Sequence, residues 1–495
     1  MGAAVLAALA IAEAAILAAS VKQHSSRRKW IRTRTVTSIC EAAVLAMLMA
    51  LPFPPVAFDF RWKALLAVLV VRAVIALIVF LARGKKADAD APHRTPRMVL
   101  NVIGSIVVIA IAAVPALVFP PYDGLPTTGD HPVRQAHAIM VDESRMDPFE
   151  QDGSYREIPV WFYYPDTSET QAGQFPLVVF SHGAFGYHES NFSLYAELAS
   201  NGYVVAALDY PHHSFFTTDT RGKTIMVDRD YLSQAMAVQG GSLSEEESYQ
   251  LAHAWLQLRM DDLGFALDTM ETAARGGSAD SGAWFFDSDG QKTLVQQALQ
   301  MADVDKVGLA GHSMGGATSV GQGRIRDEVG AVVDLDGTMF TEYGYNGDGT
   351  YTYNEDPYPV PLLSVDNDQH YRSGLETGDQ GQEYVNTHVL DNAKTSAHTY
   401  FEDSGHMNFT DLPLFSPTLA SMLGTGDMDA RACIEQTNAI VLAWFDEYLK
   451  GQGHATIAES YRAIGAPART GTPAHAQVRA RRSITMAHLS MSTST

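Results

Sequence analysis

A serine between two glycines is the residue of this chain best placed for covalent chemistry. Ser313 lies in the sequence Gly-His-Ser-Met-Gly of residues 311–315, after an apolar run and before a stretch of small residues. That order predicts a strand, a sharp turn and a helix, which is the context of a nucleophile elbow. Gly311 and Gly315 leave room that a Cβ would fill, and the turn exposes the hydroxyl above a helix N-terminus. The pattern therefore predicts Ser313 as a nucleophile.

A nucleophilic serine needs a general base, and the base needs a carboxylate that orients it. Among the histidines after Ser313, His406 fits the base best, because it lies in a loop of small residues just beyond an apolar run. The carboxylate remains open on these grounds. Four candidates end two successive predicted strands: Asp334 and Asp336, then Asp366 and Asp368.

Stabilising the oxyanion requires backbone amides near the serine. The N–H of Met314, the residue after the nucleophile, is one expected donor. The segment Ser181-His182-Gly183 follows an early apolar run, so the N–H of Ala184 is the expected second donor. Cys40 and Cys433 are the two cysteines, and no zinc-ligand spacing or disulfide framework can be built from them. We therefore expect no metal and no cofactor.

The elements that would position these residues alternate between strands and helices. Apolar runs near residues 177–180, 203–208, 307–310, 331–333 and 362–365 are continuous rather than alternating. Such runs are typical of strands buried on both faces of a parallel sheet. We predict an α/β catalytic domain over residues 155–464, a linker leading into it over 121–154, and a disordered tail over 465–495.

The first 120 residues predict a membrane unit of four helices. Each of four apolar segments approaches the ~20 residues that cross a bilayer, and they are Ala3–Val21, Ala42–Phe58, Ala64–Ala82 and Val99–Phe119. The first lacks a basic start, so we expect no cleaved signal peptide. Arg72 lies within the third segment and Glu13 within the first, and we predict an ion pair between them.

Basic residues predict the orientation of this unit. They gather between the first and second segments (Lys22, Arg27, Arg28, Lys29, Arg32, Arg34) and between the third and fourth (Arg83, Lys85, Lys86, Arg94, Arg97). By the positive-inside rule both loops are cytoplasmic. The N-terminus and the catalytic domain would then lie on the extracytoplasmic side of the cell membrane.

Charge limits the partners of the catalytic part. Residues 1–120 carry 14 Lys and Arg against 5 Asp and Glu, whereas the remainder carries 21 against 51. So acidic a domain would repel polyanions, which argues against nucleic acid as a partner. A neutral or zwitterionic ester and the lipid bilayer are the partners we expect.

Four short segments, in this order and spacing, resemble one family. They are Phe-Ser-His-Gly at 180–183, Gly-His-Ser-Met-Gly-Gly-Ala at 311–317, Leu-Asp-Gly-Thr-Met-Phe at 335–340 and His-Met-Asn-Phe-Thr-Asp at 406–411. Over about residues 155–450 the chain resembles the platelet-activating-factor acetylhydrolase group of the α/β-hydrolase superfamily. The resemblance implies an α/β-hydrolase fold, a mostly parallel sheet, and Asp336 as the acid of the triad.

A second resemblance gives a different acid. The run Gly-His-Ser-Met-Gly-Gly is equally typical of bacterial cutinase-like and polyester hydrolases. In those enzymes the acid follows the next strand, which here implies Asp366 or Asp368. The four-helix unit has no counterpart in the vertebrate acetylhydrolases.

The sequence as a whole predicts a membrane-anchored serine ester hydrolase that works through an acyl-enzyme. Membrane tethering favours short-acyl phospholipids or other lipid esters as substrates. A cutinase, polyester hydrolase or general carboxylesterase is the first alternative, and an acyltransferase is the second. A surface binding protein built on a hydrolase fold is the non-enzymatic alternative.

Overall fold

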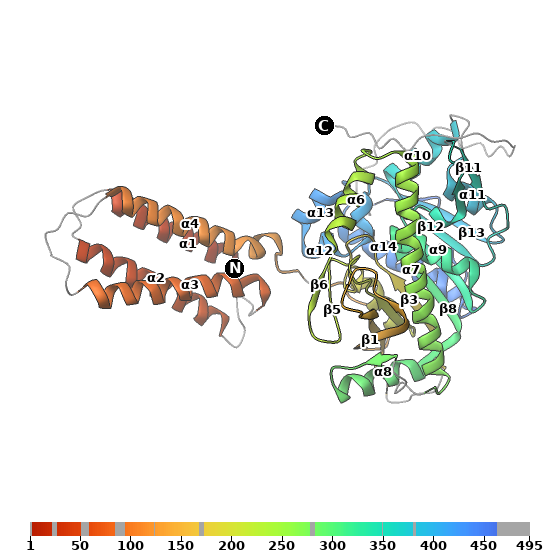
Figure 1. The fold of residues 1–495 in the computed structure, drawn as a ribbon, viewed down its shortest axis with the longest axis horizontal. Coiled ribbons are helices and arrows are strands. Elements are labelled where there is room, and N and C mark those ends of the chain that lie inside the picture. Colours follow the sequence, from red (N-terminus) through yellow and green to blue (C-terminus); the bar gives the residue numbers. More distant parts are fainter. Residues whose placement is uncertain are drawn as a thin grey trace. The chain divides into compact units, whose positions relative to one another are not determined.

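The chain forms two compact units, one built mainly from residues up to Tyr122 and one from Asp123 onward (Figure 1). The computed structural model describes residues 2–21, 27–50, 59–84, 95–122, 124–167, 173–277, 283–348, 350–379 and 383–462. The predicted tail at 465–495 lies outside these ranges.

The described residues of the N-terminal unit are almost entirely helical. Its elements are α1 (Gly2–Val21), α2 (Arg27–Met49), α3 (Phe60–Val79), a π-helical turn η1 (Phe80–Gly84) and α4 (Thr95–Val118). Leu45, Leu65 and Leu69 are almost fully buried between the helices, while Val71, Ile75 and Ile111 are exposed. A helical unit that keeps apolar side chains on its outer surface suits an apolar surrounding.

Two of these helical stretches are long and apolar enough to cross a membrane, Phe60–Ala82 and Val99–Val118. The apolar part of α1 is shorter, at Ala4–Ala18. The described residues therefore do not bear out four membrane-spanning segments. The sequence predicts four membrane-spanning segments, whereas two of the described helical stretches are long and apolar enough to cross a membrane.

The second predicted segment, Ala42–Phe58, needs correction. Helix α2 starts at Arg27, so Arg28, Lys29, Arg32 and Arg34 belong to its first turns and not to a loop. The helix ends at Met49, shortly before three prolines at positions 52, 54 and 55 that cannot continue it. A cluster of charges does not by itself end a helix, because Lys and Arg are good helix formers.

The predicted ion pair inside this unit is confirmed. Arg72 on α3 is hydrogen-bonded to Glu13 on α1 and lies 3.2 Å from Glu41 on α2. Arg34 also donates to Glu13, at 3.1 Å. Two arginines and two glutamates thus compensate one another, which lowers the cost of burying each charge.

A ten-stranded sheet forms the centre of the catalytic unit. Its strand order is β14-β13-β12-β9-β8-β3-β4-β2-β1-β7. The strands are β1 (Val133–Met146), β2 (Tyr155–Pro165), β3 (Phe175–Ser181), β4 (Val204–Leu208), β7 (Trp284–Phe285), β8 (Ala302–His312), β9 (Val329–Leu335), β12 (Leu362–Asn367), β13 (Ser396–Phe401) and β14 (Ser460–Tyr461). Every neighbouring pair from β4 through β14 is parallel, and the pairs that involve β2 or β1 are antiparallel. The predicted α/β class with a mostly parallel sheet is confirmed.

Helices cover both faces of this sheet. Side chains alternate along β3, so Leu177 and Val179 enter one core while Val178 and Phe180 enter the other. The first core is closed by α7 (Glu245–Ala274), α8 (Asp289–Met301), α9 (Met314–Ile325) and α11 (Val385–Asp391), and the second by α5 (Phe192–Ser200) and α14 (Ala430–Tyr448). Burial on both faces explains why the strands are continuous apolar runs.

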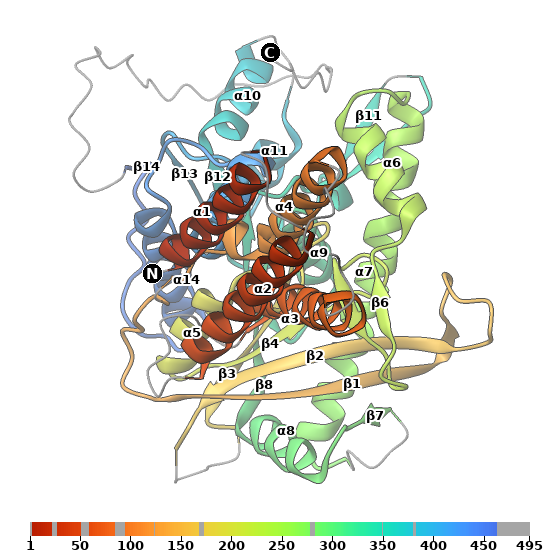
Figure 2. The same cartoon turned by 90° about the vertical axis from the view of Figure 1, so that its left-hand side faces the viewer.

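The sheet begins earlier in the chain than the sequence suggested. Strand β1 lies within residues 121–154, the stretch interpreted as a linker, and pairs antiparallel with β2 from Val133 to Met146 (Figure 2). Residues of β1 alternate between buried and partly exposed, as at Ala136, Ala138 and Met140. Its polar residues hid a strand that lies next to the short edge strand β7 and is buried mainly on one face.

The remaining elements are short and lie in the connections of the sheet. They are β5 (Phe216–Thr218), β6 (Thr224–Met226), α6 (Arg229–Gln239), η2 (Phe340–Glu342), β10 (Tyr343–Tyr345), β11 (Tyr351–Tyr353), α10 (Asp368–Asp379), η3 (His406–Phe409), α12 (Leu412–Phe415) and α13 (Pro417–Leu423).

Candidate active site

Ser313 occupies a strained turn between β8 and α9. Its backbone angles are φ 56° and ψ −124°, a conformation that side chains other than glycine rarely adopt. A Cβ at Gly311 would lie 2.2 Å from the carbonyl of Gly315, and a Cβ at Gly315 would lie 1.9 Å from the carbonyl oxygen of Ser181. Both positions therefore require glycine, and the turn has the geometry of a nucleophile elbow.

Two backbone amides beside Ser313 are available to a ligand. Within the described residues neither Ala184 nor Met314 donates its N–H to another protein group. Met314 is the first residue of α9, where the helix dipole adds partial positive charge. A Cβ at Gly183 would lie 3.3 Å from the Cβ of Ser313, so the loop that carries Ala184 packs against the nucleophile. An oxyanion requires unbonded amide donors beside the nucleophile.

The structure brings Asp336 and His406 together. Nδ1 of His406 lies 2.6 Å from Oδ2 of Asp336, although 70 residues separate them in the chain. The Asp336 side chain is fully buried, whereas that of His406 is 39% exposed. Since Nδ1–H donates to the carboxylate, Nε2 of His406 is left as the ring's proton acceptor. This is the tautomer that a general base for Ser313 requires.

His406 is held beside the elbow by the residue before the nucleophile. The ring of His312 lies 4.5 Å from that of His406, tilted by 39°, and its Nε2–H donates to the His406 carbonyl at 3.1 Å. Burial lowers the pKa of His312 to about 3, so it stays neutral. Among the described contacts the Ser313 hydroxyl makes no hydrogen bond to His406. Such bonds are often long before a substrate binds.

Hydrogen bonds keep Asp336 ionised despite its burial. Burial alone would raise the pKa of this carboxyl, but hydrogen bonds from His370 and His406 hold it well below its usual value. The backbone N–H and the side-chain amide of Asn367 donate to its two oxygens at 2.8 and 2.5 Å. The φ of Asp336 is +59°, which turns its side chain back toward β12. The carboxylate is thus both fixed and charged.

None of the other predicted acids contacts His406 among the described residues. Asp366 accepts a hydrogen bond from His398 Nε2 at 2.7 Å, and Asp368 pairs with Arg372 on α10 at 2.9 Å. Asp334 accepts from the N–H of Gly337 at 3.0 Å. The structure thus places Asp336 against His406 and does not place Asp366, Asp368 or Asp334 there.

One family matches most of the catalytic domain. The family described as platelet-activating factor acetylhydrolase, isoform II, matches residues 162–458, which is more than half of the chain. The chain belongs to this family. The match includes Ser313, Asp336 and His406, and it begins after the N-terminal helices.

Two acetylhydrolases and one esterase are similar to the chain. A platelet-activating factor acetylhydrolase of Bos taurus is 24% identical over 308 residues, 60% of this chain and 61% of the relative. One of Cavia porcellus is 23% identical over 288 residues, 56% of this chain and 58% of the relative. The chain thus spans about three fifths of the length of these relatives. The structure of a ferulic acid esterase from Streptomyces cinnamoneus aligns with a TM-score of 0.48 and 22% identity, over 66% of this chain and 93% of that one.

In this member of the acetylhydrolase family a second histidine contacts the acid. Nδ1 of His370 lies 3.0 Å from Oδ1 of Asp336, on the opposite oxygen from His406. Nε2 of His370 is hydrogen-bonded to the hydroxyl of Tyr384. Burial would lower the pKa of His370, but Tyr384, Asp366 and Asp336 raise it well above the usual value. A chain of hydrogen bonds therefore runs from Tyr384 through His370 to Asp336.

His370, Asn367 and Tyr384 were not predicted as site residues. His370 lies in the first turn of α10, directly after β12. Because β12 is the parallel neighbour of β9, the ends of both strands meet at one edge of the sheet. The adjacency of β9 and β12 would have indicated that His370 lies near Asp336. Asp336, Asp366 and His370 lie close enough to hold a cation, but the hydrogen bonds described above already engage these groups.

One pocket, with a volume of about 300 Å³, has both aromatic and acidic walls. Its lining includes Phe149, Tyr231 and Trp255 as well as Asp228 and Asp230. The Tyr231 hydroxyl lies 3.6 Å from Sδ of Met314. Met314 itself does not line the pocket, so Tyr231 is the residue that links the pocket to the nucleophile helix.

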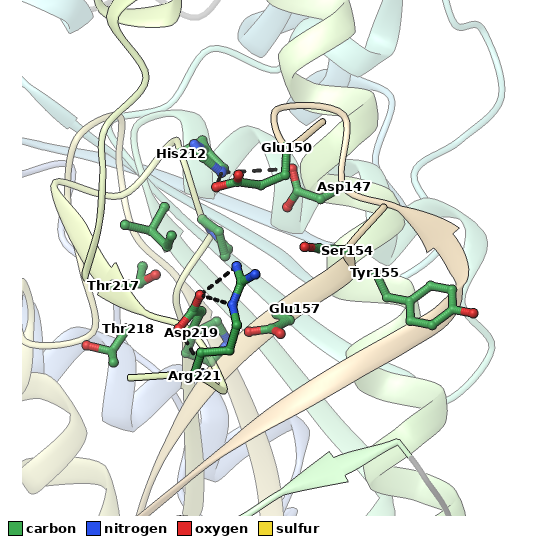
Figure 3. A pocket seen from close by; sticks show the side chains of 13 residues that line it. Asp147, Glu150, Ser154, Tyr155, Glu157, His212, Thr217, Thr218, Asp219 and Arg221 are labelled. Carbon is green, nitrogen blue, oxygen red and sulfur yellow. Dashed lines mark hydrogen bonds and ion pairs between the residues drawn. The ribbon is translucent and has the colours of Figure 1, made fainter. Parts of the chain in front are cut away.

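A smaller pocket, beside His212, is lined by acidic side chains (Figure 3). Arg221 donates to Asp219 at 2.9 Å, and Lys223 donates to Glu150 at 3.2 Å. Thr220 donates to both oxygens of Glu157, at 2.7 and 2.8 Å. Because protein donors already occupy these carboxylates, we assign the pocket no part in catalysis.

Proposed function

We propose that the catalytic domain is a serine carboxylic ester hydrolase whose triad is Ser313, His406 and Asp336. The observation that carries the proposal is the 2.6 Å contact between His406 and a buried, ionised Asp336, beside a serine in a positive-φ elbow. Membership of the acetylhydrolase family supports it. The chemistry needs no metal or cofactor, because each step is a proton or acyl transfer.

Acylation comes first. The Ser313 oxygen attacks the ester carbonyl while His406 Nε2 takes the hydroxyl proton, and the carbonyl π electrons move onto oxygen. The N–H groups of Ala184 and Met314 stabilise that oxyanion. When the tetrahedral intermediate collapses, the bond to the alcohol breaks and His406 returns the proton to the leaving oxygen. Asp336 stabilises the imidazolium throughout.

Deacylation repeats these steps with water. His406 removes a proton from the water as its oxygen attacks the acyl-serine, and the same amides hold the second oxyanion. The acyl–Ser313 bond then breaks, the serine recovers its proton from His406, and the carboxylic acid leaves. Solvent reaches His406 because its side chain is 39% exposed.

Lipid esters with a short acyl chain are the substrates we infer. The relatives of Bos taurus and Cavia porcellus are platelet-activating factor acetylhydrolases, and Tyr231, which contacts Met314, lines a pocket with further aromatic walls. The excess of 51 acidic over 21 basic residues after position 120 disfavours polyanionic substrates. Neutral or zwitterionic esters fit this charge.

The N-terminal unit, we propose, anchors the enzyme in the cell membrane, with the catalytic domain on the extracytoplasmic side. Two apolar helices of sufficient length support the anchoring, and the basic residues at the start of α2 support the orientation. Protease treatment of intact cells should remove the catalytic domain. Cleavage only after lysis would show that the catalytic domain lies on the cytoplasmic side.

Labelling with a fluorophosphonate tests the hydrolase proposal. The probe should label the wild-type chain and leave Ser313→Ala unlabelled, whereas a binding protein would show no label that depends on Ser313. A series of p-nitrophenyl esters, run beside short-acyl phospholipids in vesicles, tests the substrate. Equal kcat/KM for soluble and lipidic esters of the same acyl chain would contradict the lipid preference.

A further inference from the structure

One buried cation of the catalytic domain has no carboxylate partner. Arg259 on α7 is fully buried, yet within the described residues it forms no salt bridge. Its neighbour Arg156, also fully buried, instead pairs with Asp147 at 3.0 Å and Asp262 at 2.7 Å. Burying a guanidinium without a counter-charge is costly, so its position calls for an explanation.

The guanidinium of Arg259 donates hydrogen bonds to the loop that carries Ala184. Nη1 donates to the carbonyl of His182 at 2.6 Å, and Nη2 donates to the carbonyl of Gly183 at 3.3 Å. Tyr210 lies under the guanidinium, with 4.6 Å from Cζ to the ring centroid, and Nε faces His213 Nδ1 at 3.4 Å. The flat group is therefore held on its face and at its edge, with two donors aimed at successive carbonyls.

These contacts determine where the Ala184 amide points. In a trans peptide the C=O and the following N–H face opposite directions. The Gly183 carbonyl is turned toward Arg259, and His182 Nδ1 lies 2.7 Å from the same oxygen. The N–H of Ala184 must then face away from Arg259. Its N–H meets no protein acceptor among the described residues, and the loop packs against Ser313 at Gly183.

We propose that Arg259 is a positioning residue for the oxyanion hole. By holding the carbonyls of His182 and Gly183, it aims the Ala184 N–H at the oxygen that becomes negative when Ser313 attacks. The positive charge behind the carbonyl also polarises the peptide, which strengthens its N–H as a donor. This inference rests on the proposed hydrolase function.

Arg259 itself does not touch the substrate in this account. Its effect should therefore appear as charge develops on the carbonyl oxygen and not when the ester binds. Loss of the guanidinium should lower kcat and leave KM nearly unchanged. A residue that merely fills the core would lower the amount of folded enzyme without changing the kinetics of each folded molecule.

The test compares Arg259→Met, Arg259→Lys and Arg259→Ala with the control Arg275→Met. Arg275 is an exposed arginine at the end of the same helix. Active enzyme is counted by fluorophosphonate titration, and kcat and KM are measured on a short-chain p-nitrophenyl ester. We expect Arg259→Met to lower kcat on the order of 10²-fold, the loss typical of one oxyanion donor. Arg259→Lys should lose less, because an ammonium can hold one carbonyl but not both.

Two readouts separate positioning from folding. Added guanidinium should restore part of the kcat of Arg259→Ala and do nothing for Arg275→Met. A matched ester and thionoester pair should lose selectivity in Arg259→Met, because the hole favours oxygen over sulfur. If kcat for each titrated site and the ester selectivity are unchanged in Arg259→Met and Arg259→Lys, the inference is overturned. Activity that survives in Ser313→Ala would instead overturn the hydrolase proposal itself.

Discussion

Two fully buried aspartates of the catalytic domain are stabilised in different ways. Asp262 accepts hydrogen bonds from the guanidinium of Arg156, at 2.7 and 3.2 Å. Asp336 is held by two imidazoles and an asparagine, and no guanidinium contacts it among the described residues. A permanent cation fixes a carboxylate, whereas an imidazole can gain and lose a proton beside it. The first arrangement stabilises the fold and the second suits proton transfer.

Other buried aspartates show how many donors an ionised carboxylate needs. Asp334 accepts one hydrogen bond from the protein, its Oδ2 has no partner, and burial raises its pKa well above the usual value. Asp411 accepts two from Ser193, both at 2.6 Å, and burial raises its pKa to about 6. Asp336 accepts four and its pKa is lowered. The hydrogen bonds around Asp336 thus outweigh the same burial.

The largest expected effect comes from removing the charge of Asp336, the aspartate held by imidazoles. Asp336→Asn should lower kcat on the order of 10⁴-fold, because an amide cannot stabilise the imidazolium or select the tautomer of His406. The fold should persist, since Asn keeps the shape of the side chain. Steady-state kinetics, with the active sites titrated, measure the loss. A decrease below tenfold would mean that another carboxylate serves His406, and Asp366→Asn and Asp368→Asn would then be examined.

The next largest effect comes from removing Arg156, the cation that binds Asp262. Arg156→Met leaves buried Asp262 with Arg145 as its remaining cation, at 3.0 Å, and should lower the free energy of unfolding by about 3 kcal/mol. The kcat of each folded molecule should stay within about twofold, since the ester chemistry uses neither group. Urea unfolding of the catalytic unit and titrated kinetics measure both quantities. A large fall in kcat with unchanged stability would contradict the division of roles.

A smaller effect sharpens the role of the second histidine. His370→Phe removes one charge-assisted hydrogen bond from Asp336 and should lower kcat by about 10–100-fold. His370→Gln can still donate and should lose less. Because the pKa of His370 is raised in the fold, its stabilisation is present at low pH and is lost as pH rises through the folded pKa. Stability curves for wild type and His370→Phe should therefore converge at high pH; parallel curves would refute this assignment.

The smallest effect concerns Asp411, a buried carboxylate with fewer donors. Its folded pKa of about 6 lies above the ordinary value of 3.8, so its contribution to stability is present below pH 3.8 and disappears as pH rises through 6. Between pH 5 and 7 we expect a loss of about 1 kcal/mol from this group. Asp411→Asn should remove that slope in urea unfolding. An unchanged slope would show that Asp411 is ionised throughout.

Local patterns predicted the elbow, and long-range register explains what they missed. Glycines at 311 and 315 and the strand before them are contiguous in the sequence, so the turn at Ser313 could be anticipated. The contact between His370 and Asp336 depends on β12 lying beside β9, which no local window reveals. For the same reason spacing alone left four acids open. Only the resemblance to the acetylhydrolase group favoured Asp336.

Elsewhere, composition misled the interpretation. The polar residues of β1 obscure its alternation of buried and exposed side chains, and this stretch therefore resembles a linker in the sequence. The start of α2 resembles a loop because it is basic. The pairing of Arg72 with Glu13 was predicted correctly, because a charged residue inside an apolar helix has few alternatives to a partner of opposite charge.

Trapping the acyl-enzyme tests the central claim most directly. The chain is mixed with p-nitrophenyl acetate, quenched in acid within milliseconds to seconds, and digested for mass spectrometry. We predict one acetyl group per chain on the peptide that contains Ser313, at a level that rises and then decays, and none in Ser313→Ala. An acetyl group on a different residue, or turnover by wild type that Ser313→Ala fully retains, would contradict the account.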